Sequence, residues 1–332
     1  MSKLKIALLC PDVCTNRLGR AYVLWQLLRK QYDPVIVGPD KGHGLWRPLA
    51  KFALPVVVVP RGRAGLWEVP ASLHPDLLYV VKPLWESLGV GLRHKLHHNI
   101  PLMLDVDDIW RIHKLSRYWL GELALHSTVP FLAARTAPSP ALAGFYGADL
   151  IVPHTRDAAV FDPARFDKEQ SRAALGLAGI KPVMFLGTPR AHKGLPELAS
   201  AVAELAQPDV KFVFIDTTPD RSLTASLERL APGRLVGLPP FSFADLPFVL
   251  SAAEAVVLPQ QASLMGRYQF PAKLLDALAM GLPIIASALG DIPWALGDAG
   301  LLYAPGDKSA LKAQLAKLLD DESLCSSLGL AA

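Results

Sequence analysis

The chain has 332 residues, of which 51% are hydrophobic, and its 34 Lys and Arg against 30 Asp and Glu give a formal net charge of +4. A single hydrophobic core rarely serves a chain of this length, so we expect two domains. The charge is too mild to indicate nucleic-acid binding, and the longest apolar runs, such as residues 55–60, are too short to span a membrane as a helix.

The first half of the chain alternates short apolar runs with segments of helical pattern. The runs are KIALLC, PVIVGP, PVVVVP, LLYVVK, PLMLDV and DLIVP. This alternation is typical of parallel strands joined by crossover helices. The first run starts at once, without the apolar region and cleavage site of a signal peptide, so we expect a cytoplasmic protein.

The loop after the first run, PDVCTNRLGR, carries Gly19 and Arg20 just ahead of an aromatic, apolar helix. A glycine lets a ligand approach the backbone closely, so Gly19 is a candidate binding residue in the N-terminal half. The loop lacks the paired glycines of a GxGxxG fingerprint, which argues against binding of NAD.

Two basic segments of the first half, GLRHKLHHN and RIHKLSRYWL, combine cations with aromatic side chains. The residues concerned are Arg93, Lys95, Arg111, Lys114, Arg117, Trp110, Tyr118 and Trp119. This mixture suits peripheral contact with an anionic membrane, although a solvated helix face is the slightly favoured interpretation.

The motif DVDD places Asp105, Asp107 and Asp108 at the end of a predicted strand. Carboxylates at such an edge can bind a metal ion, activate a substrate hydroxyl, or hydrogen-bond to the next turn. Carboxylates alone at this spacing are a weak metal signal. We therefore expect no metal, and a role for Asp107 and Asp108 either on the substrate side or in the structure.

A polar, proline-containing stretch, IVPHTRDAAVFDPARFDKEQ, separates the first half from a second series of apolar runs. These runs are PVMFLG, VKFVFID, RLVGL, AVVLP and LPIIAS. We expect two Rossmann-like α/β domains that face each other across a cleft, at residues 1–155 and 156–332. In the closing segment, Leu311, Leu315, Leu318 and Leu319 share one side of a predicted amphipathic helix that packs on the second domain.

The loop after PVMFLG gathers cations just before a helix. It contains Gly187, Thr188, Arg190, Lys193 and Gly194. The partial positive charge of a helix N-terminus disfavours Lys and Arg there unless an anion occupies the same space. The loop therefore suits a diphosphate, while simple exposure of Arg190 and Lys193 is the competing interpretation.

A second cation meets a predicted helix start in YQFPAKLLDALAMGLPIIAS, where Pro271 suits the first helical position and Lys273 falls in the first turn. Lys273 and Asp276 are spaced for an ordinary intrahelical pair, which contributes about 0.2–0.5 kcal/mol. Asp276 is surrounded by leucines, however, and an ionised carboxylate there needs hydrogen-bonding partners. We predict that Asp276 accepts hydrogen bonds from ribose hydroxyls beside a phosphate held by Lys273.

Three stretches of the second half resemble glycosyltransferases of the GT-B fold, in particular the large retaining group called family four, or glycosyl transferases group 1. The stretches are FLGTPRAHKGLPELASAV, FPAKLLDALAMGLPIIAS and LGDIPWALGDAGLLYAPGD. The first half is similar more weakly, in NRLGRAY, LMLDVDDIW and YGADLIVPHTRDAAVFDP. The resemblance identifies Lys193 and Gly194 with the family's Lys-Gly pair, and Asp276 with its ribose-binding glutamate.

Two positions depart from the family pattern. The family has a further glutamate near the donor sugar, and its position holds Tyr268 here. The arginine that usually follows the glycine of the phosphate loop is Thr188, with Arg190 two residues later. The contacts with the donor sugar must therefore differ from those of the family.

The resemblance implies transfer of a sugar, with retention of configuration, from a UDP- or GDP-linked donor to a hydroxyl of a glycan, lipid or small molecule, without a metal or other cofactor. The C-terminal domain would bind the donor and the N-terminal domain the acceptor, with Gly19 on the opposite wall of the donor site. Arg190 and Lys193 would stabilise the departing diphosphate. Two alternatives stay open: a non-catalytic GT-B protein that binds a nucleotide or sugar, suggested by Tyr268, and a nucleotide-sugar epimerase.

Overall fold

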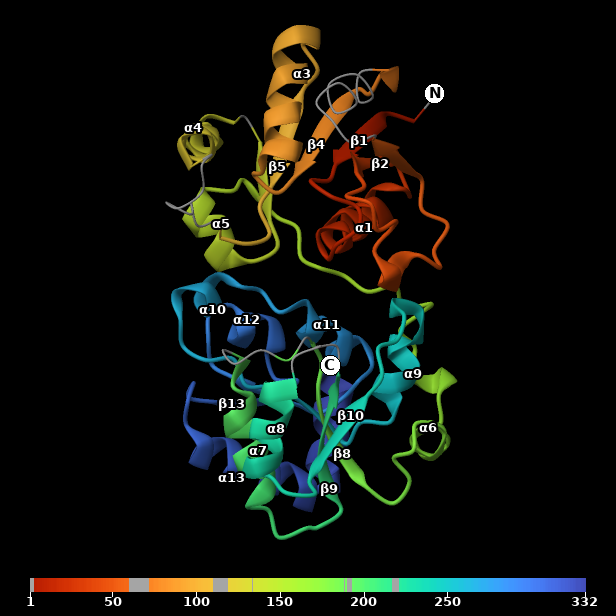
Figure 1. The fold of residues 1–332 in the computed structure, drawn as a ribbon, viewed down its shortest axis with the longest axis vertical. Helices are drawn as coiled ribbons and strands as arrows, with labels where there is room; N and C mark the ends of the chain where they lie inside the picture. Colours follow the sequence, from red (N-terminus) through yellow and green to blue (C-terminus); the bar gives the residue numbers. More distant parts are fainter. Residues whose placement is uncertain are drawn as a thin grey trace. The chain divides into compact units, whose positions relative to one another are not determined.

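The chain forms two compact units, Met1–Thr155 and Arg156–Ala332, each an α/β domain around a parallel sheet (Figure 1). The residues that the computed structural model describes are 3–59, 72–109, 119–132, 134–187, 189, 193–216 and 221–332. The predicted α/β class with two Rossmann-like domains is confirmed.

The N-terminal unit is built on a seven-stranded parallel sheet with the order β3-β2-β1-β4-β5-β6-β7. The strands are β1 (Lys5–Leu9), β2 (Asp33–Pro39), β3 (Val56–Val59), β4 (Leu77–Val81), β5 (Leu102–Asp105), β6 (Arg135–Ala137) and β7 (Leu150–Ile151). The central strands read as almost continuous apolar runs because helices cover both faces of a parallel sheet.

The helices of the N-terminal unit follow these strands in alternation. They are α1 (Arg17–Leu28), α3 (Val90–His98), α4 (Trp119–Ser127) and α5 (Pro140–Tyr146), with shorter turns η1 (Arg47–Leu49), η2 (Trp85–Gly89) and η3 (Val129–Phe131). Helix α1 begins earlier than predicted, so Gly19 and Arg20 lie inside its first turns rather than ahead of it. The helix starts early because Asp12 accepts hydrogen bonds from Cys14 and Thr15 and closes the preceding loop.

The C-terminal unit has a six-stranded parallel sheet with the order β10-β9-β8-β11-β12-β13. Its strands are β8 (Lys181–Phe185), β9 (Val210–Ile215), β10 (Leu235–Leu238), β11 (Ala255–Leu258), β12 (Ile284–Ser287) and β13 (Gly300–Tyr303). Its helices are α6 (Lys168–Ala174), α7 (Leu195–Ala203), α8 (Arg221–Leu230), α9 (Leu246–Ser251), α10 (Leu264–Tyr268), α11 (Ala272–Ala279), α12 (Ile292–Leu296), α13 (Lys308–Asp320) and α14 (Glu322–Ala331), with short turns η4 (Pro163–Arg165) and η6 (Phe243–Asp245).

Two apolar cores cover the two faces of the C-terminal sheet. Successive residues of β8 alternate between them, with Val183 and Phe185 in one core and Met184 in the other, as the two-residue period of a strand requires. The predicted closing helix is α13, whose Leu311, Leu315 and Leu318 are fully buried in the same core as Val183. Leu319 packs against that core while partly exposed.

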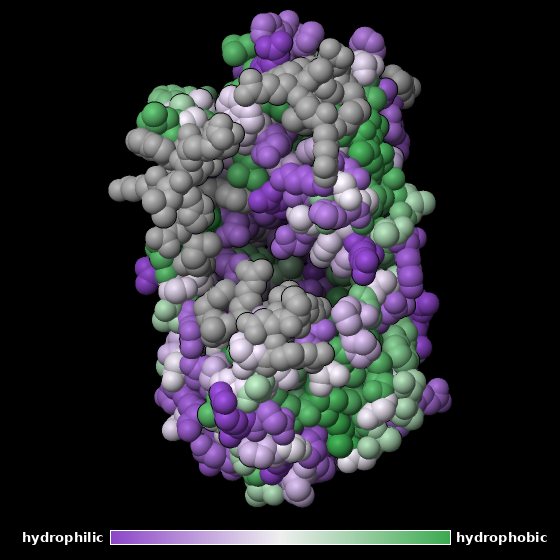
Figure 2. All heavy atoms as spheres, viewed as in Figure 1, coloured by the Kyte–Doolittle hydropathy of each residue, from purple (hydrophilic) through white to green (hydrophobic). Residues whose placement is uncertain are grey.

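On the face drawn in Figure 2, hydrophobic side chains of the C-terminal unit gather over β10 and α9. Phe241, Phe243 and Phe248, which lie in or next to η6 and α9, are partly buried there against the core. None of the helices in the described part of the chain is long and apolar enough to cross a membrane.

The six strands of the C-terminal sheet follow the same order as the first six strands of the N-terminal sheet, and in each sheet the direction of winding reverses at one point. That point lies between β1 and β4 in the N-terminal unit and between β8 and β11 in the C-terminal unit. Ligands of open parallel sheets bind at the carboxyl ends of the strands beside such a reversal. We therefore expect candidate site residues in the loops after these four strands.

Candidate functional site

The loops after β8 and β11 meet at the reversal point through a glycine. Gly194, just before α7, has φ 68°, and a Cβ atom built on it would lie 1.7 Å from the carbonyl oxygen of Pro259. Only glycine fits such an approach, because any side chain would overlap the facing backbone. Gly194 thus brings the N-terminus of α7 against the loop that follows β11.

Polar side chains join the same two segments. Lys193 donates a hydrogen bond to Gln269 Oε1, and Gln261 Nε2 donates to Glu197 Oε1 at 2.6 Å. The predicted cationic loop and the segment before α11 therefore lie side by side, as a shared site requires. Gly187, with φ 146°, occupies a conformation that favours glycine. Thr188 and Arg190 lie outside the described residues, so their predicted roles stay predictions.

Helix α11 carries the predicted ribose and phosphate ligands. It starts at Ala272, so Pro271 is the residue before the helix rather than its first residue. Lys273 lies in the first turn with its side chain 42% exposed, and its Nζ is 3.7 Å from Asp276 Oδ2. The predicted cation and carboxylate are therefore neighbours, although this distance exceeds that of a hydrogen bond.

Asp276 is fully buried and forms an ion pair that the sequence analysis missed. Arg156, the first residue of the C-terminal unit, donates from Nε to Asp276 Oδ1 and from Nη2 to the carbonyl of Ala272 at 2.9 Å. Among the described residues, Asp276 Oδ2 has no hydrogen-bond partner. The need of a buried acid for a cation was a usable signal, but nothing in the sequence selected Arg156 from the other arginines.

Tyr268 ends α10 and is partly exposed, directly before the Gln269 that Lys193 contacts. Gly290, after β12, lets its loop lie directly against α10, because a Cβ atom on it would be 2.1 Å from the carbonyl oxygen of Arg267. The structure therefore sets Tyr268 at the same edge of the sheet as Lys193. Its contact with a donor sugar stays a prediction.

The acids of the N-terminal unit lie in different surroundings from those of Asp276. Asp105, the last residue of β5, is fully buried and accepts two hydrogen bonds from Arg20, at 2.7 and 2.8 Å, and one from Thr136 at 2.7 Å. Arg20 also donates to the carbonyl of Val152 at 2.8 Å. Asp105 therefore joins β5, β6 and α1 and is a structural residue.

Asp107 and Asp108, the predicted acceptor-side acids, follow β5 and are already engaged. Asp107 pairs with Lys82 at 2.8 Å, and Lys82 holds a left-handed backbone with φ 70° at the end of β4. Asp108 Oδ1 accepts the backbone N–H of Ile109 at 3.0 Å, as expected for an acid that stabilises the next turn. Their catalytic roles stay predictions.

The described residues contain no group of three or more His, Cys, Asp or Glu side chains that could hold a metal ion.

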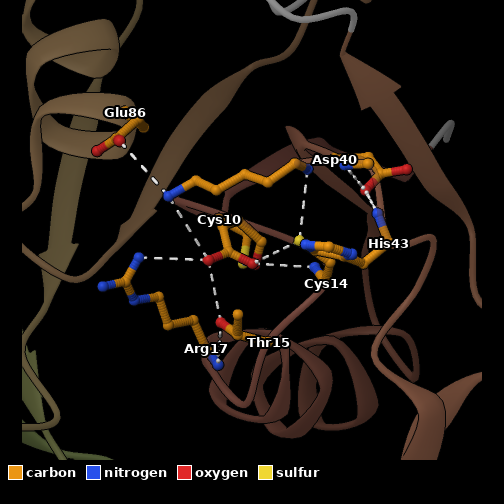
Figure 3. Close-up of polar contacts among 10 residues, drawn as sticks. Cys10, Cys14, Thr15, Arg17, Asp40, His43 and Glu86 are labelled. Carbon is orange, nitrogen blue, oxygen red and sulfur yellow. Dashed lines mark hydrogen bonds and ion pairs between the residues drawn. The ribbon is translucent and has the colours of Figure 1, made fainter.

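A polar cluster around Asp12 follows β1 (Figure 3). The Asp12 carboxylate accepts hydrogen bonds from the backbone and thiol of Cys14, from Thr15 and from Arg17. Lys41 Nζ lies 3.8 Å from Asp12 and 3.8 Å from Glu86. Burial of Asp12 opposes its ionisation, but the bonds from Cys14 and Thr15 outweigh this effect, so the pKa of Asp12 is lowered from 3.8.

Two further predictions concern the N-terminal unit. Gly19 lies in α1 against the ring of Trp46, 3.4 Å from where its Cβ would be, and its contact with a donor stays a prediction. In the basic segments, Arg93 and Leu96 of α3 are exposed. Residues 110–118 lie outside the described residues.

Residues 181–321, which include Lys193, Tyr268, Lys273 and Asp276, match the family model of glycosyl transferases group 1. The match covers most of the C-terminal unit. Among curated proteins, the D-inositol 3-phosphate glycosyltransferase of Segniliparus rotundus is 30% identical over 193 residues, which are 54% of this chain and 41% of that protein. The chain spans less than half the length of the curated relatives that it matches.

Solved structures show that the chain has the GT-B fold. Anabaena HepE in complex with UDP and glucose has a TM-score of 0.77 and 20% identity, with 98% of this chain and 92% of that chain covered. The UDP-GlcNAc 2-epimerase of Neisseria meningitidis has a TM-score of 0.65 and 13% identity, with 98% and 94% covered. The predicted resemblance to GT-B glycosyltransferases of group 1 is confirmed.

Proposed function

We propose that this chain acts as a group 1 glycosyltransferase, which transfers a sugar from a UDP- or GDP-linked donor to an acceptor hydroxyl with retention of configuration. The observation that carries the proposal is Asp276 Oδ2, a buried oxygen that accepts no hydrogen bond from the described residues. A buried acceptor left without a donor destabilises a protein by about 1–3 kcal/mol. A ribose hydroxyl that donates to Oδ2 would remove this penalty and bind the nucleotide.

The cations at the carboxyl edge of the C-terminal sheet suit the departure of a diphosphate. Negative charge grows on the diphosphate as the bond to the sugar breaks, and preorganised cations stabilise it. Lys193 and Lys273 lie on the two segments that meet there, and Arg190 belongs to the same loop as Lys193. An oxygen of the departing diphosphate can take the proton of the acceptor hydroxyl, so no protein nucleophile, metal or other cofactor enters this scheme.

The names of the similar proteins support a nucleotide-sugar donor. HepE was solved with UDP and with UDP-glucose, and the Segniliparus relative is named a D-inositol 3-phosphate glycosyltransferase. The acceptor side of the proposal, a glycan, lipid or small molecule bound by the N-terminal unit near Asp107, rests on the family pattern alone. Peripheral contact with an anionic membrane is part of the same proposal, supported by the exposed Arg93 and Leu96 of α3.

A non-catalytic nucleotide-binding protein is the second candidate, because Tyr268 offers no carboxylate near the donor sugar. A screen of UDP- and GDP-sugars with the full chain separates the candidates. Transfer or slow hydrolysis releases the nucleoside diphosphate, epimerisation changes the sugar while the nucleotide sugar stays intact, and a binding protein does neither.

The ribose assignment is tested by the change Asp276→Ala. We expect the affinity for UDP or GDP to fall by about 1–3 kcal/mol, the range for loss of a buried hydrogen bond. The measurement is calorimetric titration of the full chain. Asp209→Ala serves as a control, because Asp209 precedes β9 at the opposite edge of the same sheet. Unchanged affinity in a folded Asp276→Ala protein would falsify the assignment.

A further inference from the structure

Arg156 is unusually well fixed for a residue outside any helix or strand. Its side chain is 9% exposed, and its guanidinium donates to Asp276 and to the carbonyl of Ala272. The guanidinium carbon lies 5.7 Å from the ring centre of Phe161 and 5.5 Å from that of Phe243. An acid, a carbonyl and two aromatic rings therefore hold one cation in a single orientation.

This arrangement makes the two oxygens of Asp276 unequal. Oδ1 accepts from Arg156, whereas Oδ2 is buried without a hydrogen-bond donor among the described residues. Lys273 Nζ is the cation beside Oδ2, at 3.7 Å, and its side chain is 42% exposed. A half-exposed lysine can turn toward a phosphate without leaving a gap in the core, and this movement would give a ligand access to Oδ2.

We propose that Arg156 is a positioning residue that leaves Asp276 one accepting oxygen, so that the protein reads one ribose hydroxyl of the donor rather than the vicinal pair. A carboxylate oxygen can accept two hydrogen bonds, but Asp276 is fully buried and Arg156 is bonded at its Oδ1, so Oδ2 is the oxygen left for a ligand and its direction is fixed. This inference rests on the proposed function, since it assumes that a nucleotide binds beside α11.

The proposal predicts unequal effects of the two ribose hydroxyls. The full chain is titrated calorimetrically with UDP, 2′-deoxy-UDP and 3′-deoxy-UDP, and with the GDP series if GDP binds more tightly. For the wild type, we expect one deoxy analogue to bind within about twofold of the parent nucleotide and the other to bind about tenfold more weakly, as loss of one hydrogen bond to a charged acceptor implies.

Variants of Arg156 test the positioning role. Arg156→Met should reduce the tenfold difference between the analogues to within about threefold, because Asp276 is no longer held with one oxygen occupied. Arg156→Lys keeps a donor for Oδ1 and should preserve the difference. Arg172→Met is the matched control: Arg172 is also buried and bonds an acid, Glu254, and the carbonyl of Ala252. It should lower stability and leave the difference unchanged.

Each outcome supports or overturns the inference. Equal losses with both deoxy analogues in the wild type, or an unchanged difference in a folded Arg156→Met protein, would overturn it while the proposed function stands. If Arg156→Met does not fold, the wild type and Arg156→Lys still test the inference, since loss of the difference in Arg156→Lys also counts against it. If the wild type binds neither UDP nor GDP, the proposed function fails and the inference fails with it.

Discussion

Three buried acids at the carboxyl edges of the two sheets differ in their hydrogen bonding. In the N-terminal unit, Asp12 and Asp105 are saturated by donors from their own unit. In the C-terminal unit, Asp276 keeps one buried oxygen without a donor among the described residues. A saturated carboxylate holds loops together, whereas a buried oxygen without a donor can be completed by a ligand or by a water molecule. The same fold thus separates a structural acid from a candidate binding acid by its hydrogen-bond partners.

Close glycine contacts and ion pairs connect the segments at these edges. Loops of the C-terminal edge approach each other through Gly194 and Gly290, where a Cβ atom would overlap a facing carbonyl oxygen. In the N-terminal unit, Gly38 approaches the carbonyl oxygen of Cys10 in the same way, and the side-chain pairs Arg20 with Asp105 and Lys82 with Asp107 also connect the strands. Close backbone contacts are intolerant of any side chain, while ion pairs are sensitive to removal of one charge.

The largest effect is expected from Gly194→Ala. The new Cβ would overlap the carbonyl oxygen of Pro259 in a left-handed conformation, so the C-terminal unit should lose roughly 4 kcal/mol or more from overpacking and backbone strain together. The measurement is urea unfolding of the full chain. Gly233→Ala is a matched control, since Gly233 has φ 66° and no atom within 4 Å of its Cβ position. It should lose only about 1–2 kcal/mol. Equal losses in both variants would show that the contact with Pro259 is unimportant.

Much of the fold follows from the sequence because its signals are local. The apolar runs of β1, β4, β8 and β12 mark buried parallel strands, and the leucine spacing of α13 gives its buried face. Lys193 before α7 and Asp276 in α11 were also predicted from the local sequence. A cation at a helix N-terminus and an acid among leucines each need a further partner. Helix boundaries were less accurate, since α1 starts at Arg17, directly after a loop that the hydrogen bonds of Asp12 close.

The rest could not be predicted because it depends on contacts between distant segments. Arg156 and Asp276 are 120 positions apart, and Arg20 and Asp105 are 85 apart. The sequence shows that a buried acid needs a cation, but only the fold selects which one. For the same reason, the spacing of DVDD could not reveal that Asp105 is structural while Asp107 pairs with Lys82.

The second effect is expected from Arg20→Met in the N-terminal unit. Removing the cation leaves Asp105 buried among polar groups without its main partner, so the unit should lose about 3 kcal/mol. The double variant Arg20→Met with Asp105→Leu removes both charges and should recover part of the loss, because no unpaired charge stays buried. Denaturant unfolding measures both variants. A double variant less stable than Arg20→Met would contradict the interpretation of this pair as a structural unit.

The smallest effect, and the one with a distinctive pH dependence, is expected from Asp12→Asn. The lowered pKa of Asp12 means that the unfolded chain binds a proton more readily than the folded protein, so the stability contributed by Asp12 is present above pH 3.8 and is lost as the pH falls through the folded pKa. We expect Asp12→Asn to lose about 1–2 kcal/mol at pH 7, the range for hydrogen bonds to a charged group, and the difference from wild type to shrink below about pH 4. Unfolding free energies between pH 7 and pH 3 measure this, with the exposed Asp33→Asn as control. A difference that stays constant over this range would mean that Asp12 stabilises its loop without its charge, and the contrast between the saturated N-terminal acids and Asp276 would then lose its electrostatic basis.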